Sequence, residues 1–119
     1  MGLSRKLQKL ETIANRLGYM VTPGRQNECR VADQVITVNA RQSLDKRAWA
    51  LAHEIGHAKT YKRCMEEVGE RACTHEHEWA SLEWELRAWA VADKLLRKLK
   101  LFTKEYMQWK HACLRSYYS

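Results

Sequence analysis

The stretch ALAHEIGHAKT, residues 50–60, decides how this chain folds. It places His53 and His57 four residues apart, with Glu54 directly after the first histidine. On an α-helix, side chains at this spacing lie one above the other on one face, so both imidazoles can reach one tetrahedral zinc ion at about 2.0–2.1 Å. Glu54, one step round the helix, can reach a water on that metal, which is where a general base belongs. The stretch therefore predicts a metal-binding helix.

The alternative is a coincidence of two hydrogen-bonded core histidines, but this composition gives only about 0.02 chance matches to H-E-x-x-H. The neighbours Trp49, Leu51 and Ile55 are apolar, which indicates that the helix is buried. Gly56 costs roughly 1 kcal/mol relative to alanine in a helix interior. A glycine at this position indicates close approach of another backbone, and we expect it to be the helix that carries the third ligand.

A third protein ligand should come from a later helix, and the region offers four glutamates: Glu76, Glu78, Glu83 and Glu85. Glu85 lies within an apolar stripe between Leu82 and Ala88, where an unpaired carboxylate would be costly. Glu83 is nearer the edge of the stripe, and the first two glutamates are explained as partners of the helix dipole. We therefore expect Glu85 to complete the site.

The residues before this helix predict one helix and a small sheet. Leucines at helical spacing indicate a helix over 3–17, capped by Ser4 and stopped in a left-handed conformation by Gly18. Pro23–Gly24 is typical of a turn. Residues 29–39 indicate a hairpin with one strand at Arg-Val-Ala and one at Val-Ile-Thr-Val, joined at Asp-Gln.

Further helices follow, and each begins at a capping residue: Ser43, Thr74 and Thr103. The first of them carries the histidines and is expected to end near Lys62, before a polar connection over 63–73. The order of helix, two or three strands and further helices predicts the α+β class. The length of 119 residues predicts a single domain over 1–119.

Composition limits the location and the partners of the protein. There is no apolar run of membrane-spanning length, and the basic N-terminus is amphipathic rather than signal-like, so a cytoplasmic protein is expected. In that reducing compartment the four cysteines are expected to be thiols: Cys29, Cys64, Cys73 and Cys113. The net charge of +7 favours a polyanion or an acidic protein as a partner.

The chain resembles the ImmA/IrrE-like zinc metallopeptidases, in particular the small stand-alone forms of phages and mobile elements. The resemblance covers residues 5–97 and rests on these matches: His53, Glu54, Gly56, His57, Glu85, Ala88, Ala92, Leu95 and Leu96. Trp89 and Val91 stand where the larger family often has Asn and Phe, and RKLK replaces its proline after the Leu-Leu pair. We expect no helix-turn-helix domain within these residues.

The resemblance implies a minimal gluzincin-like peptidase with one Zn²⁺ per chain on His53, His57 and Glu85. Its substrate would be a protein, such as a DNA-bound repressor or a host regulator. Donors for the oxyanion of the reacting carbonyl are expected among three residues: Tyr61, His75 and His77. A substrate chain would extend along a sheet edge, which we expect at Val35–Val38.

Three other interpretations stay open. A non-catalytic zinc module could act on DNA or a regulatory protein, although Glu54 argues against a purely structural site. A SprT-type protease would need a third histidine, and His111 is the distant choice. Cys64 and Cys73 with His75 and His77 could hold a second zinc, although the cysteine spacing is long for such a site.

A basic face is expected near the C-terminus from four residues: Lys94, Arg97, Lys98 and Lys100. It could contact phosphates or dock an acidic partner. The preferred interpretation is the solvated side of two helices. Lys104 and Lys110 extend the same basic region. The tryptophans and tyrosines interspersed with it could stack nucleic-acid bases, but the preferred interpretation is that they are core residues.

Overall fold

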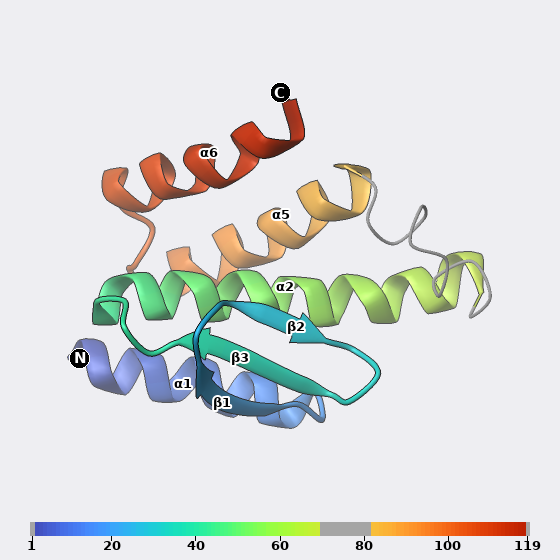
Figure 1. Cartoon of the computed structure of the whole chain (residues 1–119), viewed down its shortest axis with the longest axis horizontal. Helices are drawn as coiled ribbons and strands as arrows, with labels where there is room; N and C mark the ends of the chain where they lie inside the picture. The colour runs from blue at the N-terminus through green and yellow to red at the C-terminus, as the bar shows by residue number, and fades with distance from the viewer. Residues whose placement is uncertain (1, 70–81, 119) are drawn as a thin grey trace.

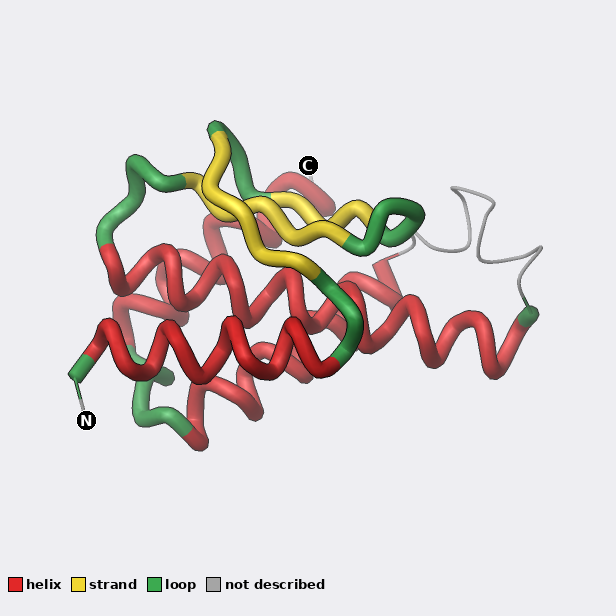
Figure 2. Tube along the Cα trace, turned by 90° about the horizontal axis from the view of Figure 1, so that it is seen from below, coloured by secondary structure: helices red, strands yellow, loops and turns green. Residues whose placement is uncertain are grey.

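Four helices and a three-stranded sheet make up the part of the chain that the computed structural model describes, residues 2–69 and 82–118 (Figure 1). This arrangement confirms the predicted α+β class. The elements are α1 (Leu3–Arg16), β1 (Met20–Gly24), β2 (Glu28–Arg30), β3 (Val35–Asn39), α2 (Leu44–Val68), α5 (Leu82–Lys98) and α6 (Lys104–Tyr118). Figure 2 shows the sheet as one layer lying against the helices.

Helix α2 is central, and α1, α5 and the sheet pack around it. Ser43 caps it as predicted, because its hydroxyl accepts a hydrogen bond from the backbone N–H of Lys46 at 3.4 Å. The middle turns of α2 are mostly buried, and Leu51 and Ile55 are fully buried. Burial on nearly all sides explains why this helix lacks a clear polar face.

The predicted end of α2 at Lys62 is wrong, because the helix continues to Val68. No glycine or proline interrupts the polar segment before Gly69, which takes φ +87°. Cys64 is fully buried in a small cluster with Trp84 of α5. This packing extends the helix two turns beyond the region that the hydrophobic pattern identified.

The sheet has the order β1-β3-β2, with β1 parallel and β2 antiparallel to β3. The predicted turn at Pro23–Gly24 is wrong, because both residues end β1. Proline is tolerated because β1 is an edge strand, and a Cβ at position 24 would overlap the side chain of Thr37. The predicted hairpin is confirmed, with Gln34 at φ 56° in its turn. Its first strand is Glu28–Arg30, earlier than expected.

Helix α1 lies on α2 through Leu7, Leu10 and Ala14. The predicted cap at Ser4 is wrong, because the helix already begins at Leu3 and no side chain caps it. Gly18 takes φ +91°, which confirms the left-handed stop. The chain then continues from Gly18 into β1.

Helix α6 is fastened to α5 by a polar network around Asp93. The Tyr106 hydroxyl donates to Asp93 Oδ1 at 2.6 Å, and Lys110 Nζ lies 2.7 Å from Asp93 Oδ2. Thr103 caps α6 as predicted, since its hydroxyl accepts from the Tyr106 N–H at 3.1 Å. Lys110 therefore belongs to a mostly buried ion pair and not to a solvated basic face.

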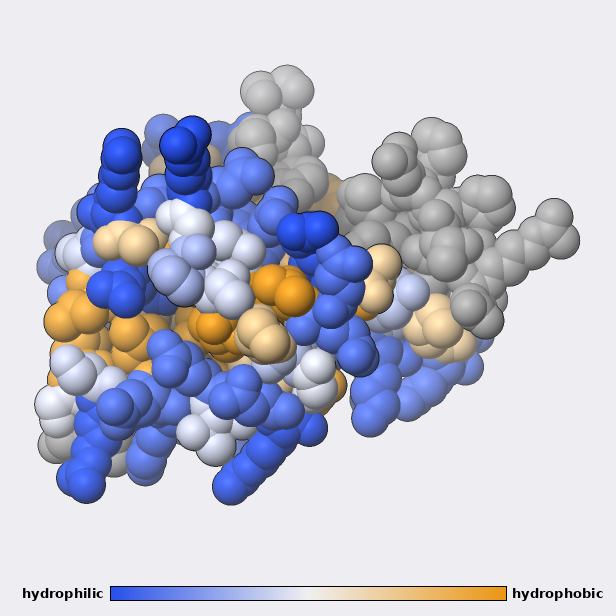
Figure 3. Space-filling view, turned by 60° about the horizontal axis from the view of Figure 1, so that its bottom comes forward, coloured by the Kyte–Doolittle hydropathy of each residue, from blue (hydrophilic) through white to orange (hydrophobic). Residues whose placement is uncertain are grey.

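Figure 3 shows one face of the molecule, on which a band of hydrophobic residues is bordered by hydrophilic ones. None of the described helices is both long and apolar enough to span a membrane.

The expectation of four thiols is wrong for Cys64, which is disulfide-bonded. It rested on an assumed reducing compartment and not on geometry. Cys29 and Cys113 form no disulfide, and Cys73 lies outside the described residues.

Candidate metal centre

Two histidines of α2 and one carboxylate of α5 meet in the interior of the molecule. His53 Nε2 lies 2.9 Å from Glu85 Oε1, and His57 Nε2 lies 3.2 Å from Glu85 Oε2. The histidines are about four-fifths buried or more, and Glu85 is buried. Both Nε2 atoms thus point at one carboxylate that comes from a helix 32 residues further along the chain.

Gly56 explains how the carboxylate comes within reach. A Cβ at this position would overlap the carbonyl oxygen of Ala88 and lie 2.9 Å from its carbonyl carbon. The backbones of α2 and α5 are therefore in contact where Gly56 of α2 meets Ala88 of α5, close to the two histidines and Glu85. The close approach of the helix that carries Glu85, which the sequence predicted, is therefore confirmed.

Glu54 is a second buried carboxylate beside the same histidines, with 5% of its surface exposed. Its Oε2 lies 3.6 Å from His53 Nδ1, which is beyond hydrogen-bond distance. Ligand atoms of His53, Glu54 and His57 all lie within 4.8 Å of one another. Glu85, however, contacts both Nε2 atoms at once, whereas Glu54 approaches His53 at Nδ1.

Electrostatics in the centre follow from burial and from these contacts. Burial raises the pKa of Glu54, and the two histidines only partly offset this. Burial would also raise the pKa of Glu85, but the hydrogen bonds from both histidines outweigh it and hold that pKa well below its usual range. Burial lowers the pKa of His57, while Glu85 and Glu54 raise it, with a net increase. The environment of Glu54 thus favours its protonated form, whereas the environment of Glu85 favours its ionised form.

Trp89 holds the ring of His53 in place. Its indole stacks on the imidazole with centroids 3.8 Å apart and an interplanar angle of 15°. Sequence reasoning identified Trp89 only as a core residue, and it is 1% exposed. Its spacing of four residues after Glu85, on the same helical face, is the signal that could have placed it at the centre. Trp109 of α6 supports it edge-on at 5.5 Å.

Strand β2 and helix α6 also reach the centre. Burial and the neighbouring charge of Glu54 raise the pKa of Cys29 on β2 to about 12, against a weak lowering by Tyr19. Burial, followed by Glu85 and Glu54, raises the pKa of Cys113 on α6. Cys29 on β2 and Cys113 on α6 are thus close enough to the buried carboxylates of the centre for their pKa values to respond to them.

The other predicted site residues lie at different places in the structure, and some lie outside the described residues. Tyr61 follows His57 by one turn of α2 and lines a cavity of about 470 Å³ with Tyr19 and Ala58. His75 and His77 lie outside the described residues, as do Glu76 and Glu78. His111 is exposed on α6 and is not among the grouped ligand atoms. Glu83 is an exposed partner of Arg87.

Two surface predictions can also be placed. The four basic residues 94, 97, 98 and 100 are all exposed, with the Arg97 guanidinium 4.3 Å from the ring centroid of Phe102. The expected substrate edge at Val35–Val38 is wrong, because these residues belong to the central strand β3, which is paired on both sides.

The donor set fits a zinc-like ion. Two imidazole nitrogens and a carboxylate are a common ligand set of catalytic zinc, which leaves one position open. Ligand atoms around a tetrahedral ion at this bond length are roughly 3.3 Å apart, and the contacts of 2.9 and 3.2 Å are close to that spacing. The residues present could therefore hold the ion with small side-chain shifts.

Comparison with known proteins agrees with this centre. No curated protein and no solved structure matches the chain. A family model described as the IrrE N-terminal-like domain (Peptidase_M78) matches residues 5–92. The match includes most of α1, the sheet, α2 and most of α5, and so covers His53, Glu54, His57 and Glu85. The chain therefore belongs to the IrrE N-terminal-like family of metallopeptidases.

Proposed function

We propose that the chain acts as one domain, a zinc-dependent endopeptidase with His53, His57 and Glu85 as metal ligands and Glu54 as general base. The observation that carries the proposal is the contact of both Nε2 atoms with a single carboxylate from α5, at 2.9 and 3.2 Å. Glu85 is buried, and a carboxylate on the surface would rarely contact two imidazole nitrogens at once. Glu54 stands beside this cluster without such a contact, as a base must.

The chemistry divides between the ion and the chain. Zinc supplies Lewis acidity toward the scissile carbonyl and lowers the pKa of a water to about 7. Glu54 accepts the proton of the attacking water on a carboxylate oxygen and later donates it to the leaving amine nitrogen. Trp89 fixes the plane of His53. Among the described residues, Tyr61 is the proposed hydrogen-bond donor to the oxyanion. His75 and His77 are proposed as alternative donors.

The substrate chain would bind along strand β2 and not along the central strand β3. It is an edge strand of the sheet, so in the described part of the chain its outer backbone groups have no ladder partner. Its residues Glu28 and Cys29 are close enough to Glu54 to interact with it electrostatically. A peptide that adds to this edge would pass beside the centre with its main chain hydrogen-bonded.

The substrate class follows from the family resemblance alone. We infer a protein substrate, such as a DNA-bound repressor or a host regulator of a phage or mobile element, cleaved in the cytoplasm. The non-catalytic alternative gains no support, because a structural zinc site has no use for the buried Glu54. The SprT-type alternative is disfavoured because Glu85, and not the exposed His111, faces the two histidines.

The experiment is peptide-library cleavage by zinc-loaded wild type and Glu54→Gln, read by mass spectrometry. The substitution keeps the shape of the side chain and removes the base, so turnover should fall by about 10²–10⁴. Glu66→Gln is the matched control, because Glu66 is exposed on the same helix, and it should retain full activity. No cleavage by wild type, or full cleavage by zinc-loaded Glu54→Gln, contradicts the proposal.

A further inference from the structure

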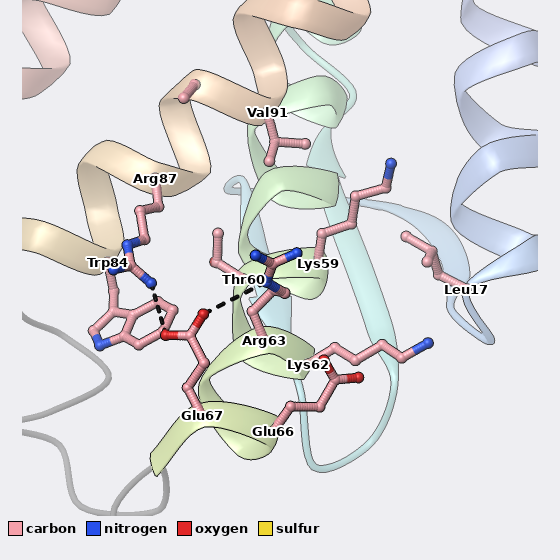
Figure 4. A pocket seen from close by; sticks show the side chains of 11 residues that line it. Leu17, Lys59, Thr60, Lys62, Arg63, Glu66, Glu67, Trp84, Arg87 and Val91 are labelled. Carbon is pink, nitrogen blue, oxygen red and sulfur yellow. Dashed lines mark hydrogen bonds and ion pairs between the residues drawn. The ribbon is translucent and has the colours of Figure 1, made fainter.

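A groove runs between α1 and α5, on the side of α2 that faces away from the metal centre. Both helices pack on α2 but barely contact each other. A cavity of about 640 Å³ opens between them, where Lys59 and Arg63 of α2 lie between Leu17 at the end of α1 and Val91 of α5 (Figure 4). A second cavity of about 310 Å³ adjoins it along the same two helices. Because both cavities lie between α1 and α5, we treat them as one groove.

The two cavities adjoin because their lining residues are neighbours. Leu17 borders the first cavity and Arg16 the second. On α5, Val91 borders the first and Leu95, one turn later, borders the second. The groove therefore follows α1 and α5 for several turns, which is the length scale of a docked helix.

The floor of the groove is apolar. Its aliphatic residues are packed against the core on one side and line the cavities on the other: Ile13, Leu17, Val91, Leu95 and Leu99. Four of them are only partly buried. They retain surface that an apolar partner could cover.

The two rims of the groove, on α1 and α5, are cationic, and α2 adds basic residues between them. Seven basic residues line it, from Lys9 and Arg16 on α1 to Lys98 on α5, against only Glu66 and Glu67. Glu67 already pairs with Arg87 at 3.1 Å and approaches Arg63 at 3.6 Å. No ion pair within the described residues engages the remaining five: Lys9, Arg16, Lys59, Lys62 and Lys98.

An apolar floor between two cationic rims selects one kind of partner. An acidic amphipathic helix would place its apolar face on the floor and its carboxylates against both rims. A nucleic acid backbone would use the cations but would leave the floor without a partner, because its contacts are mainly electrostatic. The combination of floor and rims therefore favours a protein helix.

We propose that this groove binds an acidic amphipathic helix of a partner protein. Lys59 lies about 200° round α2 from His57, so a helix in the groove would not touch the metal centre. The inference does not depend on peptide hydrolysis. It can be tested with metal-free protein or with Glu54→Gln, so a failure of the proposed peptidase activity would not affect the result.

The test is fluorescence anisotropy with a labelled acidic amphipathic peptide, which has leucine at helical spacing and glutamate elsewhere. The groove variant is Lys59→Glu with Lys98→Glu. The control is Lys46→Glu with Lys104→Glu, two exposed lysines in the first turns of α2 and α6, away from the groove. Both double variants change the net charge equally. We expect about tenfold weaker binding for the groove variant and roughly twofold at most for the control.

The apolar floor has a test of its own. Ala90 is exposed on α5 and lines the groove, so Ala90→Gln, which changes polarity without changing the charge, should fold normally and weaken binding of the peptide. A scrambled peptide of the same composition should bind at least about tenfold more weakly than the amphipathic one. Circular dichroism confirms that each variant is folded.

Several results would overturn the proposal. The peptide could fail to bind wild type, or the scrambled peptide could bind equally well. The two double variants could lose binding equally, which would mean that only net charge matters. Duplex DNA could bind more tightly than the peptide and displace it, with the groove variant alone affected, which would assign the surface to nucleic acid.

Discussion

Replacing Gly56 by alanine should destabilise the protein, although alanine is the better helix former. The substitution gains roughly 1 kcal/mol of helix propensity in α2. The new Cβ would overlap the carbonyl oxygen of Ala88 and lie 2.9 Å from its carbonyl carbon and 3.1 Å from its Cα. These are backbone atoms, so relief requires a shift of α5 as a whole. Overpacking typically costs about 1–3 kcal/mol, and a helix shift belongs at the upper end, which leaves a net loss of about 1–2 kcal/mol.

The same shift should weaken metal binding, because Glu85 lies one turn before Ala88 on α5. Moving α5 outward lengthens its contacts with His53 and His57, now 2.9 and 3.2 Å. Urea unfolding of the metal-free protein measures the first effect, and zinc titration against a competing chelator measures the second. Gly2→Ala is the control, because a Cβ there has no neighbour within 4 Å. A more stable Gly56→Ala protein with unchanged zinc affinity would refute the reasoning.

Three further predictions concern the packing around the centre. Trp89→Leu should lower zinc affinity by about tenfold and more than Trp109→Leu does, because only Trp89 stacks on His53; equal losses in zinc titrations would count against it. Chelation should lower the melting temperature by several degrees, and an unchanged melting curve after demonstrated metal loss would disagree. Burial and Asp93 raise the pKa of Tyr106 above its usual 10.0, so its hydroxyl stabilises the fold fully below pH 10 and progressively less above it. Tyr106→Phe should therefore cost about 1 kcal/mol near neutral pH in urea unfolding, and the difference from wild type should narrow above pH 10; a constant difference would be inconsistent with this.

The local parts of the site could be predicted from sequence because they depend on helical geometry. The spacing of His53 and His57, the cost of Gly56 and the apolar setting of Glu85 are all properties of single helices. The structure brings these residues together at the distances given above. The roles of the residues, including those of Tyr61, His75 and His77, stay predictions.

The parts that sequence could not supply depend on long-range contacts. β1 contains a proline and a glycine and has little alternation, and it exists because β3 pairs with it in parallel. That pairing makes β3 the central strand and leaves β1 and β2 as the edges of the sheet. The extension of α2 depends on the packing of Cys64 against Trp84. In the sequence alone, Lys110 cannot be distinguished from a surface lysine. Only the packing of α6 on α5 brings it to Asp93.

The most direct test of the central claim is the zinc content of wild type, Glu54→Gln and Glu85→Gln after metal loading and dialysis. Both glutamates lie beside the same histidines, so the two variants separate a ligand from a base. We predict one zinc per chain in wild type and in Glu54→Gln, and a large loss of zinc in Glu85→Gln. Loss of zinc in Glu54→Gln with full retention in Glu85→Gln would contradict the account.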